Sequence, residues 1–254
     1  MRKYATPLIV LGLIVALAAP AGAVVLMAET FTYPNGNLAG NGTWTTHSGA
    51  GTDIQVSTGQ ALGNMANAPD DNATFAAQSA TAKTYVCLQV KIPTPAATPV
   101  TNYFAHFKDA TTFDFNARIY VMPSGSTFTF GLSTGSCASP CVIAQWPSAL
   151  AYDTYYELVA SYDAAAGSVE LWVNPTAITD PKITHSTWSG TTSQVGMLVS
   201  AYALRQSTGG IPSGTSNWTY LVDNIAVGTT FDFICAAPTP TQSSTWGKIK
   251  TVYR

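Results

Sequence analysis

The chain has 254 residues, of which 46% are hydrophobic and only 9% are charged, and its formal net charge is -2. An average soluble domain carries about 25% charged residues, so this scarcity excludes a helical protein with charged solvent faces and disorder driven by high charge. It also argues against nucleic acid as a partner, because 11 Lys and Arg residues spread along the chain do not make the basic patch that phosphate binding requires.

The first 23 residues have the pattern of a signal peptide. Arg2 and Lys3 precede an apolar run at 8–19, and Pro20 leads into the small-residue sequence Ala-Gly-Ala at 21–23. The run is about 12 residues long, too short for a bilayer core of roughly 30 Å, and no later segment is long and apolar enough to cross one. We therefore expect a secreted or surface-held mature chain without a transmembrane span. An uncleaved membrane anchor is the alternative.

Residues 24–235 alternate apolar and polar side chains in short stretches separated by Gly, Pro, Asn and Ser, as half-buried β-strands do. No window has the sustained i, i+3, i+4 apolar spacing of an amphipathic helix. About a dozen strands are predicted, at 24–33, 53–57, 74–78, 84–92, 103–108, 113–121, 127–132, 142–146, 155–162, 168–173, 194–204 and 218–227. So many strands favour one all-β domain, a two-sheet antiparallel β-sandwich of the jelly-roll type.

Two β-hairpins are predicted within this domain. One covers residues 113–132 and turns at Pro123-Ser124-Gly125, and the other covers 156–174 and turns at 163–167. Strands joined by such short turns pair with their sequence neighbours, so much of each sheet is expected to be antiparallel.

Four cysteines, which export would place in an oxidising compartment, allow three disulfide pairings. Cys137 and Cys141 bracket a turn-prone Ala-Ser-Pro spacer, which predicts a local bridge. That leaves Cys87, in a predicted strand, to pair with Cys235 just after the last strand. Zinc is the alternative, but it requires four thiolates to converge and the sequence has one close pair.

The chain changes character after Cys235. Residues 236–245 form a Pro, Thr and Ser linker, and residues 246–254 form a short basic and aromatic tail. A helix capped by Thr245 would place Lys248, Lys250 and Arg254 on one side and the large apolar side chains on the other. Nine residues cannot form a stable helix alone. The tail is therefore either frayed or a sorting, anchoring or docking signal that orders on a partner.

Three segments carry a family resemblance: ETFTYPNGNLAGNGTW at 29–44, YYELVASYDAAAGSVELWVNP at 155–175 and YLVDNIAVGTTF at 220–231. They resemble secreted bacterial proteins of the concanavalin A-like lectin and glucanase superfamily, in particular its laminin G-like members. The resemblance covers about residues 24–235 and implies one jelly-roll domain with a concave and a convex sheet. This superfamily contains glycosidases, lyases, lectins and adhesive modules, so the fold alone does not define an activity.

Glycosidases of this fold that resemble laminarinases carry two Glu residues in a pattern close to E-x-D-x-x-E, because the reaction needs two carboxyl groups about 5 Å apart. The chain has three Glu residues, Glu29, Glu157 and Glu170, and none lies within five positions of another. The glycosidase motif is therefore absent. Glu157 and Glu170 fall on the two arms of a predicted hairpin and could face each other, although solvent-facing polar positions explain them equally well.

A polysaccharide lyase needs a base and a group that neutralises charge, usually Tyr or His beside Arg. His106, Arg118 and Tyr120 lie on adjacent predicted strands, and Arg205 lies near the end of another. The Arg and His motifs of alginate-lyase-like members are not present. The three His residues have no metal-ligand spacing, and no Ser, His and acid set is suggested by a nucleophile elbow of the G-x-S-x-G type. Catalysis by an unfamiliar set of residues stays an alternative.

Asp223 is a candidate calcium ligand by resemblance. In similar glucanases an Asp at the start of the last strand helps to bind a structural Ca²⁺ together with backbone carbonyls, here expected around 34–36. The alternative is an Asp that accepts backbone N–H bonds at a strand edge. No other cofactor is implied.

Sugar rings stack on aromatic side chains, so exposed tryptophans are candidate ligand contacts. Trp146 and Trp188 flank loops rich in Pro, Ser and Thr, and Arg118 and Tyr120 are further candidates, whereas Trp172 lies inside a predicted strand and is expected in the core. The sequence thus favours an exported, disulfide-bonded, non-catalytic binding or adhesive module, with extracellular glycans as the implied ligand class. The alternatives are a structural surface or matrix protein without a small ligand and a divergent polysaccharide hydrolase or lyase.

Overall fold

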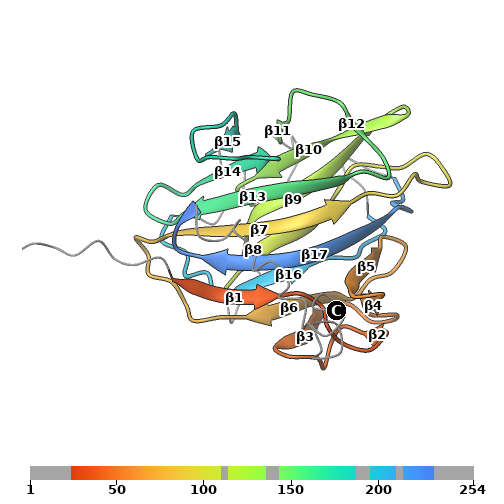
Figure 1. The fold of residues 1–254 in the computed structure, drawn as a ribbon, viewed down its shortest axis with the longest axis horizontal. Coiled ribbons are helices and arrows are strands. Elements are labelled where there is room, and N and C mark those ends of the chain that lie inside the picture. Colours follow the sequence, from red (N-terminus) through yellow and green to blue (C-terminus); the bar gives the residue numbers. More distant parts are fainter. Residues whose placement is uncertain (1–23, 110–113, 136–142, 187–194, 210–213, 232–254) are drawn as a thin grey trace, which may run out of the picture.

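The computed structural model describes residues 24–109, 114–135, 143–186, 195–209 and 214–231. In this part of the chain two large β-sheets stack face to face (Figure 1). Every strand pair in both sheets is antiparallel. The predicted all-β, two-sheet antiparallel sandwich is therefore confirmed.

The nine-stranded sheet, here called sheet A, has the order β15-β14-β13-β7-β17-β5-β4-β2, and β1 also pairs with β17. It lies nearer the viewer in Figure 1. Its strands are β1 (Val25–Glu29), β2 (Gly36–Asn37), β4 (Gln55–Ser57), β5 (Gln60–Asn64), β7 (Lys83–Lys91), β13 (Tyr155–Asp163), β14 (Ser168–Val173), β15 (Ile183–His185) and β17 (Thr219–Gly228).

The eight-stranded sheet, here called sheet B, has the order β11-β10-β9-β8-β16-β6-β3, and β12 also pairs with β10. Its strands are β3 (Trp44–Ser48), β6 (Asp70–Thr74), β8 (Asn102–Lys108), β9 (Phe115–Ser124), β10 (Thr127–Ser133), β11 (Ala144–Gln145), β12 (Leu150–Ala151) and β16 (Ala201–Leu204). Both predicted hairpins are confirmed, as β9–β10 in sheet B and β13–β14 in sheet A.

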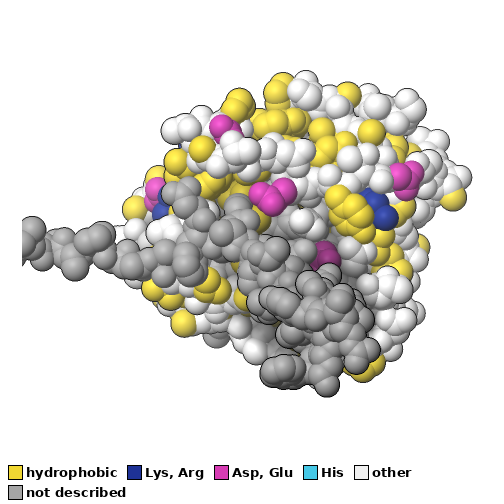
Figure 2. Space-filling view, in the orientation of Figure 1, with side chains coloured by type: hydrophobic (Ala, Val, Ile, Leu, Met, Phe, Trp, Pro, Cys, Tyr) yellow, Lys and Arg dark blue, Asp and Glu magenta, His cyan; other side chains and the backbone are white. Residues whose placement is uncertain are grey.

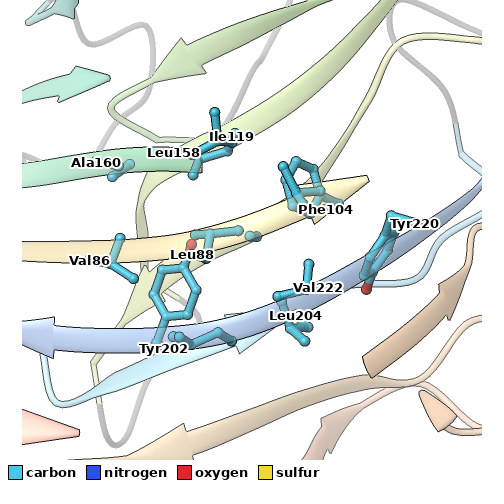
Figure 3. Close-up of a cluster of buried hydrophobic side chains, with 14 of the residues drawn as sticks. Val86, Leu88, Phe104, Ile119, Leu158, Ala160, Tyr202, Leu204, Tyr220 and Val222 are labelled. Atoms are coloured by element: carbon cyan, nitrogen blue, oxygen red, sulfur yellow. The ribbon is translucent and has the colours of Figure 1, made fainter. Parts of the chain in front are cut away.

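The core lies between the two sheets, and period-2 alternation supplies it. On β13, for example, Leu158, Ala160 and Tyr162 point inward and are fully buried. Figure 3 shows such inward side chains from both sheets meeting in one layer. The labelled members are Val86, Leu88, Phe104, Ile119, Leu158, Ala160, Tyr202, Leu204, Tyr220 and Val222.

The predicted strands differ from the observed ones mainly where strands are short or polar. β2, β3, β5, β12 and β15 are not predicted, and the predicted strand at 74–78 overlaps β6 only at Thr74. β6 reads Asp-Asp-Asn-Ala-Thr, without apolar alternation, yet its Asp70, Asp71 and Asn72 are buried. Thr46, Ser48 and the Gln206 backbone donate hydrogen bonds to its two aspartates, and single-sequence patterning does not detect such bonds.

Several predictions fall outside the described residues: the signal peptide at 1–23, the linker and tail at 236–254, and the residues Cys137, Cys141, Cys235 and Trp188. Within the described ranges no helix is long and apolar enough to cross a membrane.

Candidate functional site

Polar and aromatic side chains gather on the outer face of sheet B because the β8–β9 ladder is irregular. The register shifts around Phe104 place Tyr103 and His106, three residues apart, on the same face, where regular alternation would put them on opposite faces. Their rings pack edge to face with centroids 5.6 Å apart.

A matching irregularity on β9 brings two more side chains to this face. Ala117 has a φ of 49°, and the register shifts between Ala105 and Phe107 of the partner strand. Phe115 and Arg118 therefore both point outward, and the Arg118 guanidinium lies 5.2 Å from the centroid of the Phe115 ring. Left-handed backbone is costly at a residue other than Gly, and such strain is often retained near functional sites.

His47 reaches the same place from the other end of sheet B. It lies on β3 where the register with β6 shifts, and its ring centroid is 6.1 Å from that of His106 and 5.9 Å from that of Phe115. β3 and β8 are separated by two strands, or about 14 Å in a flat sheet. Side chains from strands three positions apart in sheet B therefore meet on its outer face. We call His47, Tyr103, His106, Phe115, Arg118 and Tyr120 the sheet B cluster.

Both histidines in this cluster have lowered pKa values and no hydrogen-bond partner among the described residues. Burial, with Arg118 and His47 nearby, holds the pKa of His106 well below its usual value. Burial, with the charge of Lys108, lowers the pKa of His47 to about 4. All four ring nitrogens are buried and have no partner within the described structure. Buried polar groups are nearly always paired, so these atoms call for a functional explanation.

Arg118 is the cation at the centre of the sheet B cluster. Its guanidinium lies 4.6 Å from the Tyr103 ring centroid, and its buried Nε has no partner within the described structure. It also contacts Tyr120, whose hydroxyl shares a 3.0 Å hydrogen bond with Ser133. Burial raises the pKa of Tyr120, so its phenol stays protonated at neutral pH. Arg118 retains 8% exposure, while His106 and Tyr120 retain none.

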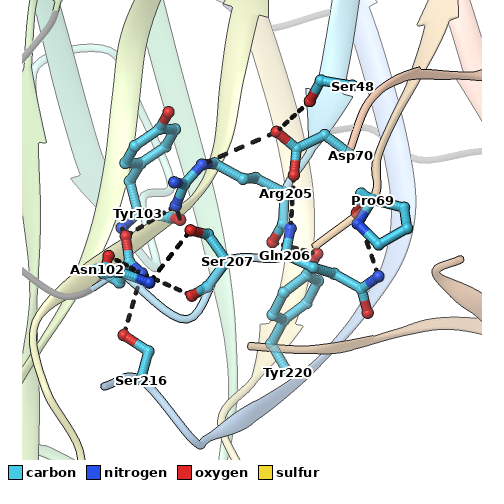
Figure 4. A network of polar contacts seen from close by, with 11 residues as sticks. Ser48, Pro69, Asp70, Asn102, Tyr103, Arg205, Gln206, Ser207, Ser216 and Tyr220 are labelled. Atoms are coloured by element: carbon cyan, nitrogen blue, oxygen red, sulfur yellow. Dashed lines mark hydrogen bonds and ion pairs between the residues drawn. The ribbon is translucent and has the colours of Figure 1, made fainter. Parts of the chain in front are cut away.

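A polar network beside the cluster fixes Arg205 and the ring of Tyr103 (Figure 4). Nη1 of Arg205 donates to Oδ1 of Asn102 at 2.8 Å, and its Nε lies 3.9 Å from Asp70. The guanidinium lies over the Tyr103 ring, 4.0 Å from its centroid. Asp70 also accepts from the Gln206 backbone N–H at 2.9 Å. Arg205 therefore already has a carboxylate partner.

The residues that the sequence offered as candidate ligand contacts lie in different parts of the molecule. Arg118 and Tyr120 meet His106 on sheet B, whereas Trp146 is half-buried and packs against the core. Trp172 is fully buried but lies on the outer face of sheet A, outside the main core.

The two hairpin glutamates do not face each other. In β13–β14, Glu170 lies opposite Ser161 and forms ion pairs with Lys83 and Lys182, each at 2.5 Å. Glu157 lies beyond the paired part of the hairpin, beside Gln89 of β7. The described residues therefore offer no glycosidase pair from these two carboxyl groups.

Asp223 is half-buried on β17 and held by protein donors. It accepts the Asn224 backbone N–H at 2.8 Å and a hydrogen bond from the Gln60 side chain. Burial raises its pKa, and Glu29 acts in the same direction. The described residues contain no group of three His, Cys, Asp or Glu side chains arranged to hold a metal ion. A calcium ion at Asp223 would thus depend on backbone carbonyls.

Comparisons with known proteins identify the fold. No family model and no curated protein matches the sequence. Among solved structures, a variant of alginate lyase Aly36B bound to an alginate tetrasaccharide matches with a TM-score of 0.53 at 12% identity, over 81% of this chain and 96% of the lyase. The CBM2 module of the evolved Dit protein of Lactobacillus casei BL23 phage J-1 matches with a TM-score of 0.53 at 11% identity, over 82% and 96%.

A third match is SCLam, a non-specific endo-β-1,3(4)-glucanase of family GH16. A variant of it crystallised with an oligosaccharide has a TM-score of 0.51 at 10% identity, over 84% of this chain and 97% of the glucanase. The chain therefore has the concanavalin A-like lectin and glucanase fold, as the sequence resemblance implied. Carbohydrate-binding and enzymatic proteins share this fold.

Proposed function

We propose that this protein is an exported, non-catalytic module that binds acidic polysaccharides on the outer face of sheet B. The observation that carries the proposal is the pair of buried imidazoles beside Arg118, His47 and His106, whose ring nitrogens have no hydrogen-bond partner among the described residues. A bound saccharide would supply the missing hydrogen-bonding groups, and its carboxylate would offer two acceptors to the planar guanidinium.

The charge of the site favours an anionic ligand over a neutral one. Three positive charges lower the pKa of His106, those of Arg118, Arg205 and Lys108. Asp70 is the partner of Arg205, but Arg118 is surrounded by the rings of Tyr103 and Phe115. A uronate carboxylate bound to Arg118 would compensate a cation that is mostly removed from water. The bound alginate in one structural match is consistent with this ligand class.

Ligand entry involves Phe115. Its half-buried ring packs on His106 with a centroid separation of 4.2 Å and also contacts His47 and Arg118. A ligand that reaches His106, His47 or Arg118 would have to displace this ring from them, so we expect binding to reorder Phe115.

A second candidate function is β-elimination of the same polysaccharide. It is favoured by the proximity of Arg118 both to His106, whose pKa is lowered, and to Tyr120, whose pKa is raised. His106 would take the proton from C5 of a uronate while Arg118 neutralises its carboxylate. The C4–O bond would then break, and the leaving oxygen would take the proton of Tyr120, which yields an unsaturated uronate.

Calorimetric titration with alginate, polygalacturonate and a neutral β-glucan tests the proposal, with ultraviolet absorbance of unsaturated uronate followed in parallel. We expect binding to an acidic polymer, weaker or no binding to the glucan, and no new absorbance. Absorbance that grows with time would favour the lyase. Absence of binding to all three polymers would contradict the proposal and favour a structural surface or matrix role.

A further inference from the structure

The outer face of sheet A carries an apolar row that runs across four strands. Trp172 of β14, Val159 of β13, Cys87 of β7 and Ala226 of β17 lie opposite one another in direct register. Each is at most 8% exposed, although none points into the core between the sheets. We call these four residues the sheet A row.

The rows on either side are more polar. Glu157, Gln89 and Asp223 line one side, and Glu170 and Ser161 lie on the other. Figure 2 looks onto this side of the molecule, and few of the side chains drawn in colour there are charged. A buried apolar row within a face of this kind requires a covering segment, because unpartnered apolar surface is costly in water.

Described residues already cover the Trp172 end of the sheet A row, where the Lys182 ammonium lies 4.9 Å from the centroid of the Trp172 ring. The Ile178 carbonyl accepts the Nε1–H of Trp172 at 3.3 Å. The ring of Phe231 lies 5.1 Å from that of Trp172 and 6.2 Å from that of Tyr85, measured between centroids. The row is about 14 Å wide, more than one phenyl ring covers. The chain continues from Phe231 as residues 232–254.

We propose that Cys87 and Cys235 form a disulfide that holds the residues after Phe231 on the sheet A row, so that the tail at 246–254 leaves from the face opposite the sheet B cluster. Cys235 follows Phe231 by four residues, which span at most about 14 Å. Cys87 is two residues from Tyr85 on the same strand face, about 6.6 Å along β7. The reach therefore includes the Cα separation of about 4.4 to 6.8 Å that a disulfide needs.

The reaction is a dithiol–disulfide exchange. One thiolate attacks the disulfide of an oxidoreductase in the export compartment, and the second thiolate then displaces that protein from the mixed disulfide. One S–S bond forms between Cys87 and Cys235 and one breaks in the oxidant, which receives two electrons and two protons. The bridge closes a loop of about 150 residues, so it strongly restricts the unfolded chain.

Tryptic mapping of the full chain tests this pairing. The protein is exported to an oxidising compartment and treated with a thiol-alkylating reagent before digestion. Trypsin cleavage places Cys87 in peptide 84–91, Cys137 and Cys141 together in 119–182, and Cys235 in 206–248. We expect 84–91 joined to 206–248, two hydrogens lighter than the sum of the two peptides and separable by dithiothreitol. Alkylated 84–91, 84–91 joined to 119–182, or a link between two copies of 84–91 would each overturn the pairing.

Two serine variants test the covering role. Cys235→Ser should raise binding of a hydrophobic dye, because the segment is released from the sheet A row. The matched control Cys141→Ser should not raise dye binding, because Cys141 is predicted to form a local bridge with Cys137 instead. Equal dye binding by the two variants would contradict the placement of the segment on the sheet A row, whatever the mapping shows.

Discussion

At the scale of single residues, the molecule contains two kinds of buried polar group. The Glu29 carboxylate accepts from the Phe31 N–H at 2.5 Å, the Tyr33 hydroxyl at 2.9 Å and the Trp44 Nε1–H at 2.8 Å. His47 and His106 are also buried, but their ring nitrogens have no partner within the described structure. Satisfied groups of the first kind stabilise the fold, whereas the second kind is a cost that ligand binding would relieve.

Glu29→Gln should lower stability by about 1.5 to 3 kcal/mol, the usual value of hydrogen bonds to a charged group. The amide nitrogen would meet N–H or O–H donors where the carboxylate accepted them. Urea unfolding measures the change, and Glu157→Gln is the control because Glu157 is only half-buried. A Glu29→Gln variant as stable as the control would show that these hydrogen bonds carry little net free energy.

The depressed pKa of His47 makes a prediction for pH. At pH above about 6.5 the ring is neutral in the folded and unfolded states and contributes no pH dependence. As the pH falls from 6.5 towards about 4, the unfolded state takes up a proton that the folded state does not, so stability is lost.

His47→Gln should therefore lose less stability than the natural protein between pH 7 and pH 4.5. The comparison matters because burial raises the pKa values of Asp70 and Asp71 to about 6, which makes the folded state gain stability as the pH falls in the same range. Chemical unfolding at several pH values gives the difference between the two proteins. Parallel curves would show that His47 does not titrate as proposed.

At the scale of elements, irregular ladders decide what the sheet B cluster contains. The regular β13–β14 hairpin follows its period-2 pattern and is predictable from sequence. Tyr103 and His106, or Phe115 and Arg118, are three residues apart, so the same period places each pair on opposite faces. The sequence identified His106, Arg118 and Tyr120 as possible partners, but not Phe115 or His47. Ala117, with its φ of 49°, carries no residue-type signal of the bulge.

Close packing of β5 against β17 gives an element-scale prediction. A Cβ on Gly63 would lie 2.0 Å from Cζ of Tyr220, whose hydroxyl donates to the Arg205 carbonyl at 2.9 Å. Gly63→Ala should therefore cost about 1 to 3 kcal/mol by overpacking. In Gly209→Ala the nearest atom, Ser207 Oγ, would be 3.7 Å away, and thermal melting should change little. Similar losses in the two variants would contradict this packing.

At the scale of the whole molecule, β1 pairs with β17, and this pairing joins the first and last described strands. The two outer faces of the sandwich differ: sheet B carries Arg118 beside two imidazoles of lowered pKa, and sheet A carries a buried apolar row. The proposed ligand site and the proposed exit of the tail therefore lie on opposite faces of the sandwich.

A calcium ion at the site predicted at Asp223 would strengthen the junction of β17 with its neighbours. If calcium binds there, EDTA should lower the melting temperature of the natural protein, and Asp223→Asn should remove that response. The same melting curve with EDTA and with added Ca²⁺ would eliminate the calcium site and leave Asp223 as a carboxylate held by Asn224 and Gln60.

The most direct test of the proposed function is the affinity of Arg118→Ala for an acidic polysaccharide, compared with that of Lys182→Ala on sheet A. Loss of a charged hydrogen bond of about 1.5 to 3 kcal/mol predicts roughly 10- to 140-fold weaker binding for Arg118→Ala. Lys182→Ala, which removes a cation paired with Glu170, should bind like the natural protein. Equal affinities for all three proteins would contradict a ligand site at the sheet B cluster.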